Sequence, residues 1–276
     1  MGGIIRGIIA PHPPIIVPEI GRGEISKVRK TIDSLNLLAE EVQRIKPELM
    51  IVISPHSPFF YDSFAINNDQ PLYGDFSAFG ASHLEFRFDN DLSFVEEVTN
   101  AARTHHLEVT PFTSRRTTFG RYGGLDHGVL VPLYYLARNY RSKIVNVSIS
   151  GLDYKSHQTW GSLLDEVVEK RGERTIFVAS GDLSHRLIPG APAGYSPRGR
   201  EFDEKIVEIV RSGDLASLTT LDADLIESAG ECGLRPLITL HGCLDRKNYQ
   251  CEFLSYEGPF GVGYLVAQVN TTTSFT

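Results

Sequence analysis

Residues 7–14 read Gly7-Ile8-Ile9-Ala10-Pro11-His12-Pro13-Pro14, and this stretch decides the fold. Its design returns in Met50-Ile51-Val52-Ile53-Ser54-Pro55-His56-Ser57-Pro58. Each stretch starts with an apolar run that lacks polar alternation, which is typical of a strand buried on both faces. The prolines that follow have no N–H and fix the backbone, so they end the strand. A histidine is therefore held on a stiff turn at the carboxyl end of each strand, where ligands bind in open α/β sheets.

The composition is that of an ordinary globular chain. The 276 residues are 41% hydrophobic and 22% charged, and no Pro/Gly/Ser-rich linker divides them. We therefore predict one domain over residues 1–270, followed by a polar tail at residues 271–276. The formal net charge is −7 and no run of Lys or Arg stands out, so we expect no nucleic-acid partner.

Cysteine usage and the N-terminus indicate the compartment. The three cysteines show no C-x-x-C spacing, which argues against a disulfide framework and for a reducing environment. No apolar stretch approaches the roughly 20 residues that span a bilayer. The first residues lack the cationic start and long apolar core of a signal peptide. We expect a cytoplasmic protein that has no membrane partner.

The chain alternates between helical and extended patterns. Periodicity predicts helices over 22–46, 91–105, 129–138, 157–171, 198–212, 222–228 and 232–244. It predicts strands over 3–10, 48–54, 84–88, 143–150 and 174–180, with a closing hairpin of 249–256 and 262–269. We therefore predict an α/β fold, a three-layer sandwich. Its central sheet is mostly parallel or mixed, with helices on both faces and a C-terminal hairpin.

Four of the nine histidines lie at predicted strand ends or helix starts, namely His12, His56, His127 and His185. If the sheet is largely parallel, the carboxyl ends of its strands share one edge, so these four side chains converge there. A lone histidine is more often a structural or surface residue, and we interpret the other five in that way. His12 and His56 share the same proline-flanked turn, so we expect them on adjacent strands as a pair of metal ligands.

Two imidazoles need a third donor to hold a catalytic metal well. The segment Ser228-Ala229-Gly230-Glu231-Cys232-Gly233 offers a carboxylate and a thiol at a helix start, where the helix dipole favours the anionic form of either. With Glu231 the site is the facial triad of non-haem Fe(II) oxygenases, which leaves open positions for substrate and O₂. With Cys232 it favours zinc or copper. We choose Glu231. The alternatives, a helix-start carboxylate and a small core cysteine, stay open.

His185 and His127 are expected to act beside the metal. An imidazole whose pKa is near neutrality takes a proton from a bound substrate hydroxyl and returns it later. Asp182 comes three residues before His185, and Asp126 directly precedes His127. We expect each aspartate to orient its histidine or to cap a turn.

Five motifs of this chain resemble the LigB-like superfamily, which comprises the class III extradiol ring-cleavage dioxygenases and the related Memo proteins. They occur in the family's order: Pro11-His12-Pro13-Pro14, Ser54-Pro55-His56-Ser57-Pro58, Asp126-His127-Gly128, Gly181-Asp182-Leu183-Ser184-His185 and Gly230-Glu231-Cys232-Gly233. The chain looks most similar to the LigB/Memo-like proteins of the AmmeMemoRadiSam group, over nearly its whole length. The resemblance implies one LigB-like catalytic domain.

The resemblance also implies roles for single residues. Fe(II) would be bound by His12, His56 and Glu231. His185 would be the acid or base of the reaction, and His127 a further active-site histidine. The implied reaction opens the ring of a catechol-like or related small aromatic substrate with O₂.

A departure from the dioxygenase pattern keeps an alternative open. In Memo proteins the third-ligand position is a cysteine followed by glycine, which here matches Cys232. The alternative function is therefore a Memo-like copper or zinc protein, with a redox or interaction role in the same pocket and no ring cleavage. The sequence leaves open the substrate and whether the chain forms a homo-oligomer or binds a partner subunit.

Overall fold

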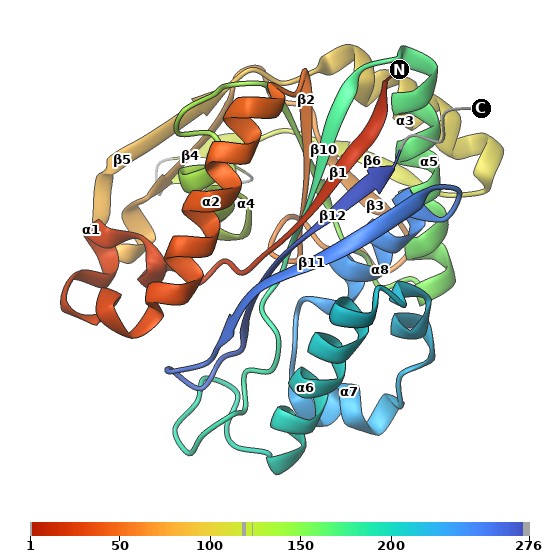
Figure 1. Cartoon of the computed structure of the whole chain (residues 1–276). Coiled ribbons are helices and arrows are strands. Elements are labelled where there is room, and N and C mark those ends of the chain that lie inside the picture. The colour runs from red at the N-terminus through yellow and green to blue at the C-terminus, as the bar shows by residue number, and fades with distance from the viewer. Residues whose placement is uncertain (1, 118–119, 123, 273–276) are drawn as a thin grey trace.

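The computed structural model describes residues 2–117, 120–122 and 124–272 (Figure 1). Within these residues the centre is an eight-stranded sheet with the strand order β11-β12-β1-β10-β2-β9-β3-β6. Its strands are β1 (Gly3–Ala10), β2 (Leu49–Ser54), β3 (Phe64–Asn67), β6 (Val109–Phe112), β9 (Lys143–Ser148), β10 (Arg174–Ser180), β11 (Asn248–Glu257) and β12 (Tyr264–Thr272). β1, β10, β2 and β9 are parallel, and β12 runs antiparallel to β1. The carboxyl ends of the four parallel strands therefore share one edge.

Helices cover both faces of this sheet (Figure 1). One face carries α2 (Arg29–Ile45), α4 (His127–Leu136) and a hairpin of β4 (Leu72–Phe76) and β5 (Ala81–Phe88). The other face carries α3 (Leu92–Ala102), α5 (Tyr154–Arg171), α6 (Pro197–Ser212), α7 (Ala223–Ala229) and α8 (Leu234–Leu244). The predicted three-layer α/β sandwich with a mixed sheet and a C-terminal hairpin is confirmed.

The central strands are buried on both faces, as their apolar runs predict. Every residue of β2 is buried. Leu49, Ile51 and Ile53 belong to the core on the α5 side, whereas Met50 and Val52 belong to the core on the α2 side. Each such side chain stabilises the fold by roughly 1.5–3 kcal/mol. This double burial fixes the register of the strands and thereby the positions of the turns that follow them.

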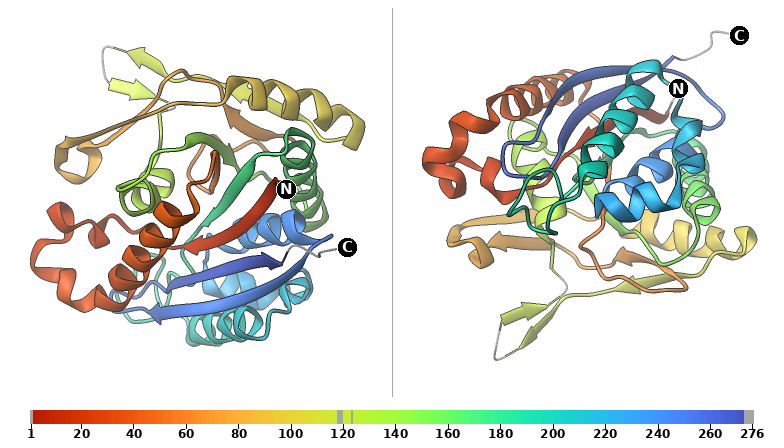
Figure 2. Two further views of the ribbon diagram at one scale, coloured as in Figure 1. Left: turned by 45° about the horizontal axis from the view of Figure 1, so that its top comes forward. Right: turned by 90° about the horizontal axis from the view of Figure 1, so that it is seen from below.

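Short elements differ from the sequence prediction. Residues Arg22–Val28 form a 3-10 helix ahead of α2, and α2 begins only at Arg29 because Val28 leaves helical geometry with φ −119° and ψ 30°. Between predicted helices, where the sequence predicted neither helix nor strand, lie β6 and the hairpin of β7 (Arg115–Thr117) and β8 (Gly120–Tyr122), which projects from the body (Figure 2). The remaining short helices are α1 (Pro18–Gly21) and the 3-10 turns Pro14–Ile16, Ser77–Phe79, Arg103–His105 and Leu215–Thr220.

The expected adjacency of the strands that carry His12 and His56 is wrong. β10 lies between β1 and β2 and pairs in parallel with both. Periodicity identifies strands but not their order in a sheet, and a strand from much later in the chain can enter between two earlier ones. The end of β10, with Ser180 as its last residue, therefore lies between the two histidine turns.

The C-terminal strand passes the predicted domain boundary at residue 270, because β12 continues to Thr272. Residues 273–276 of the predicted tail lie outside the described residues, so the boundary stays a prediction. In the part of the chain that the structure describes, no helix combines the length and the hydropathy that crossing a bilayer requires.

Buried His157 ties the turn after β9 to the start of α5. Its Nε2 accepts a hydrogen bond from the Ser150 N–H at 3.3 Å, and its Nδ1–H donates to the Asp153 carbonyl oxygen at 2.8 Å. Its ring contacts Phe64 edge-on, with the ring centroids 5.0 Å apart. Burial lowers the pKa of His157 to about 4. The folded chain therefore holds this imidazole neutral.

The free energy of unfolding should fall as the pH is lowered from about 6.5 towards about 4. In this range histidines of the unfolded chain become protonated, whereas the buried histidines of the folded chain stay neutral. His157→Phe should reduce this pH slope by about one proton, and it should also cost about 1–3 kcal/mol at neutral pH because the Ser150 N–H loses its acceptor. Urea denaturation across this pH range measures both effects. The exposed His106→Gln serves as the control. A slope unchanged by His157→Phe would contradict the burial argument.

Candidate metal centre

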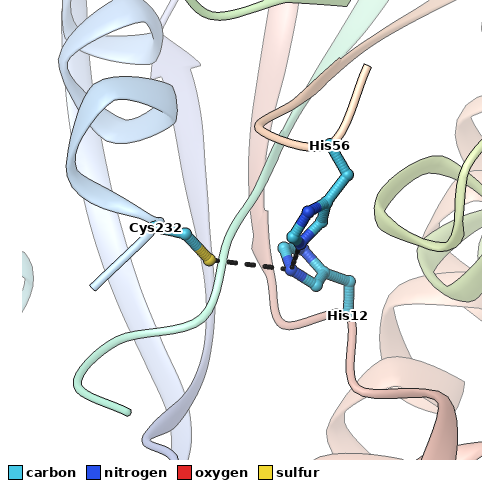
Figure 3. Close-up of side chains that lie close together, drawn as sticks. All are labelled: His12, His56 and Cys232. Atoms are coloured by element: carbon cyan, nitrogen blue, oxygen red, sulfur yellow. Dashed lines mark hydrogen bonds between the residues drawn. The ribbon is translucent and has the colours of Figure 1, made fainter. Parts of the chain in front are cut away.

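His12 and His56 meet at the carboxyl edge of the sheet (Figure 3). Their Nε2 atoms lie 3.0 Å apart. Two nitrogens at that separation can both lie about 2.1 Å from one ion, the usual Zn–N length, at an angle of roughly 90°. The two imidazoles are therefore able to share a metal ion.

Cys232 extends this pair to a group of three (Figure 3). Its Sγ lies 3.7 Å from His12 Nε2. The ligand atoms of His12, His56 and Cys232 all lie within 4.8 Å of one another. Among the described residues, this is the group of His, Cys, Asp and Glu side chains that is compact enough to hold an ion.

Cys232 reaches the histidines because its turn packs closely against the end of β10. A Cβ on Gly181 would lie 2.3 Å from Gly233 Cα, so the two backbones touch where both residues lack a side chain. The Cys232 N–H donates to the Asp182 carbonyl oxygen at 3.2 Å, and the Asp182 N–H donates to Cys232 Sγ at 3.3 Å. The Asp182 carboxylate accepts from the His12 N–H at 2.9 Å. Asp182 therefore fixes the thiol relative to the His12 turn.

The structure does not bring Glu231, our choice as third ligand, into this group. Its carboxylate accepts a hydrogen bond of 2.6 Å from the Leu234 N–H, so it stabilises the first turn of α8. Burial raises the pKa of this carboxyl above its usual value. The geometry therefore favours the alternative, in which Cys232 faces the histidines, and the ligand assignment stays a prediction.

Burial keeps the nitrogen donors neutral. The pKa of His12 lies well below its usual value because of burial and the three neighbouring imidazoles. Burial also lowers the pKa of His56. It raises the pKa of the Cys232 thiol well above its usual value. A metal that binds here would therefore find neutral imidazoles but would have to displace the thiol proton.

His127 packs against the pair, and His185 lies near enough to interact electrostatically with His12 and His56, so the structure brings the four predicted histidines together. The His127 ring centroid is 4.2 Å from that of His56 and 5.4 Å from that of His12. Burial lowers the pKa of His127 to about 4. The Nδ1–H of His185 donates to the Gly230 carbonyl oxygen at 2.8 Å, which leaves a lone pair on His185 Nε2.

Two motif aspartates have contacts that the sequence did not predict. The Asp182 carboxylate binds the His12 backbone. Asp126 stands at the start of α4 without a capping bond, and its carboxylate accepts hydrogen bonds from Ser54 and Ser57. Sequence reasoning also missed Ser180, whose Oγ lies 3.0 Å from His12 Nδ1. The available signal was its place as the last residue of a buried strand.

The family described as the catalytic LigB subunit of aromatic ring-opening dioxygenase matches residues 6–267. The chain belongs to this LigB family. The match confirms the resemblance to the LigB-like superfamily drawn from the five motifs.

Individual relatives agree with this membership. The chain is 34% identical over 272 residues to Protein CA_C1420 of Clostridium acetobutylicum, and the alignment covers 97% of this chain but 58% of that protein. It thus spans less than two thirds of that relative's length. It is 23% identical over 303 residues to the 2-aminophenol 1,6-dioxygenase beta subunit of Pseudomonas sp, over 98% of this chain and 94% of that one. The crystal structure of the uncharacterized protein JW3007 from Escherichia coli K12 shares the fold, with a TM-score of 0.63 at 15% identity over 96% of this chain and 99% of that one.

The third ligand can be tested by metal affinity. Cys232→Ala should weaken Zn(II) binding by at least about tenfold, because it removes one of three donors. Glu231→Gln should leave the affinity within about twofold of wild type, since the carboxylate stabilises α8. Isothermal titration calorimetry measures both, with Cys251→Ala as the matched cysteine control. If Glu231→Gln abolished binding and Cys232→Ala did not, the carboxylate would be the ligand.

Proposed function

We propose that the chain is a metal-dependent ring-opening dioxygenase that acts with O₂ on a catechol-like or related small aromatic compound. Its main support is the 3.0 Å separation of the Nε2 atoms of His12 and His56, because two neutral imidazoles face one point at the edge of the sheet. The family description supplies the class of reaction.

The residues fit a transition-metal ion. His12, His56 and Cys232 would hold it. Fe(II) is the ion we propose, because the resemblance to the ring-opening dioxygenases of the LigB family implies iron. A thiol donor also suits zinc and copper, so metal content is part of the test. When bound, a redox-active ion would supply a meeting point for substrate and O₂ and a path for electrons between them.

His185 is the residue we propose for proton transfer with the substrate hydroxyl. Its Nδ1–H is held by the Gly230 carbonyl oxygen, so Nε2 is the basic atom. Burial lowers the pKa of His185, which keeps the imidazole neutral and able to accept a proton at neutral pH. His127, whose pKa is about 4, would contact the substrate as a neutral hydrogen-bonding group.

A cavity of about 330 Å³ adjoins His127 and would take the aromatic ring. Its size lies within the range of small-molecule sites, about 300–1,000 Å³. Tyr73 and Phe79 line it, and the Phe79 ring lies edge-on to His127 with the centroids 5.3 Å apart. Such walls suit a flat aromatic ligand. A larger cavity of about 590 Å³ lies near Glu48 and Lys143, at the amino ends of β2 and β9, away from the histidines.

Oxygen uptake tests the proposal. After anaerobic loading with Fe(II), the protein should consume O₂ with at least one member of a panel of catechols and 2-aminophenols. His185→Gln should lower kcat by about 10²–10⁴-fold with the bound metal unchanged, because a general base is lost. On the acid side, kcat should fall at pH values below about 6.5, since burial lowers the pKa of the base.

The exposed His83→Gln controls for loss of an imidazole. A chain that binds one iron ion but shows no uptake with any diol or aminophenol would contradict the dioxygenase proposal.

The second candidate function is a Memo-like copper or zinc protein that uses the same pocket without ring cleavage. One observation favours it, namely that Cys232 rather than Glu231 joins the two histidines. It would be supported by tight zinc or copper binding that depends on Cys232 together with the absence of O₂ uptake.

We further propose that the chain assembles with a second subunit or a second copy of itself. The support is that the Pseudomonas relative is named a beta subunit. Light scattering of the purified chain separates a monomer from a homo-oligomer.

A further inference from the structure

The start of α4 contacts the turn that carries His56 and the end of β10 beside His12. This segment, the Asp126–Gly128 turn, consists of the N-cap residue Asp126 and the first two helical residues, His127 and Gly128. The side chain of Asp126 contacts the His56 turn, and the carbonyl oxygen of Gly128 contacts the end of β10 beside His12. Two separate chains of hydrogen bonds therefore start from one short segment.

The first chain of hydrogen bonds decides which nitrogen of His12 carries the proton. The Ser180 hydroxyl donates to the Gly128 carbonyl oxygen, which can only accept. With its one proton used in this way, the hydroxyl must accept from His12 Nδ1 at 3.0 Å. His12 is then protonated at Nδ1, and the lone pair on Nε2 faces His56. Ser180 is buried, so water does not compete for these bonds.

The second chain of hydrogen bonds holds the His56 turn. The Asp126 carboxylate accepts from Ser54 Oγ and from Ser57 Oγ, each at 2.7 Å. Ser54 Oγ in turn accepts from the His56 N–H at 3.1 Å. Ser57 is also bound by the Asn146 side-chain amide at 3.0 Å. The backbone on both sides of His56 is thereby tied to one carboxylate.

Gly128 is required where these two chains meet. A Cβ at this position would lie 2.3 Å from Ser54 Oγ and 2.9 Å from Asp126 Oδ1. These are the two atoms of the hydrogen bond that anchors the His56 turn. Because Gly128 has no side chain, the hydrogen bonds between Asp126 and the His56 turn can form. Its carbonyl oxygen is the final acceptor of the hydrogen bonds that start at His12.

We infer that the Asp126–Gly128 turn is a positioning element that sets the tautomer of His12 and the orientation of His56, so that both Nε2 atoms face one ion. Ser180 and Asp126 are its positioning residues, one for each histidine. The inference rests on the metal centre of the proposed function but not on ring opening. It gives Asp126 and Gly128 a role, whereas the proposed reaction assigns one only to His127 of this motif.

Ser180→Ala tests the hydrogen bonds that set the tautomer of His12. It should weaken Zn(II) binding by about 10–100-fold, the usual loss when an outer hydrogen-bond partner of a metal-binding histidine is removed. In the metal-free protein, ¹⁵N NMR of the histidine rings should show His12 change from the Nδ1–H to the Nε2–H tautomer. The matched control is Ser148→Ala at the end of β9, whose hydroxyl accepts from the Ala65 N–H. Ser148→Ala should change neither measurement.

Asp126→Ala tests the hydrogen bonds that hold the His56 turn. It also tests the inference if Ser180→Ala fails to fold. It should weaken Zn(II) binding by about 10–100-fold and shift the His56 amide resonance, yet leave the His12 tautomer unchanged. Asp153→Ala is the control, because Asp153 caps α5 through the Ser156 N–H away from the histidines. That control should lower the melting temperature without weakening Zn(II) binding.

Equal weakening by test and control variants, or an unchanged His12 tautomer in Ser180→Ala, would overturn the inference. If the wild-type protein bound no metal, the metal centre would fail, and the tautomer measurement would still decide whether Ser180 positions His12.

Discussion

The parallel pairing of β10 with both β1 and β2 is the constraint on which the rest of the structure depends. Ala10 pairs with Ser180 and Ala179 pairs with Ile53, so the three strands end at the same level. His12 and His56 each stand two residues beyond the end of their strand. Because the strands are buried on both faces, their register cannot slip without moving apolar side chains into the wrong layer. The position of the two imidazoles thus follows from core packing.

The cluster is a polar group that the fold holds in a neutral state. Since His12 carries its proton on Nδ1, the short contact between the two Nε2 atoms requires His56 Nε2–H to donate when no ion is bound. When an ion binds between them, the His56 proton must move from Nε2 to Nδ1, a change of tautomer that keeps the ring neutral. The ion must also displace the proton of the Cys232 thiol. Burial opposes charge on every member, so it keeps the imidazoles neutral and resists the loss of the thiol proton. A cation would offset the second effect by its own charge.

The sequence predicted the layers of the fold and the meeting of the histidines, because both follow from local patterns. Apolar runs identified the central strands, and prolines located the turns that carry His12 and His56. The strand order could not be predicted, since nothing local specifies that β10 enters between β1 and β2. The sequence could not decide between Glu231 and Cys232 for a similar reason. Neighbouring residues at a helix start point in different directions. Which of the two faces the histidines depends on the contact between Gly181 and Gly233, and that contact forms only in the folded chain.

X-ray absorption spectroscopy of the zinc- or iron-loaded protein tests the central claim most directly, because it reports the atoms bound to the ion. The account predicts one ion with two imidazole nitrogens at about 2.0–2.1 Å and one sulfur at about 2.3 Å, the usual lengths for zinc. It also predicts that the sulfur signal disappears in Cys232→Ala. A shell of oxygen and nitrogen without sulfur, or without the two imidazoles, would contradict the account.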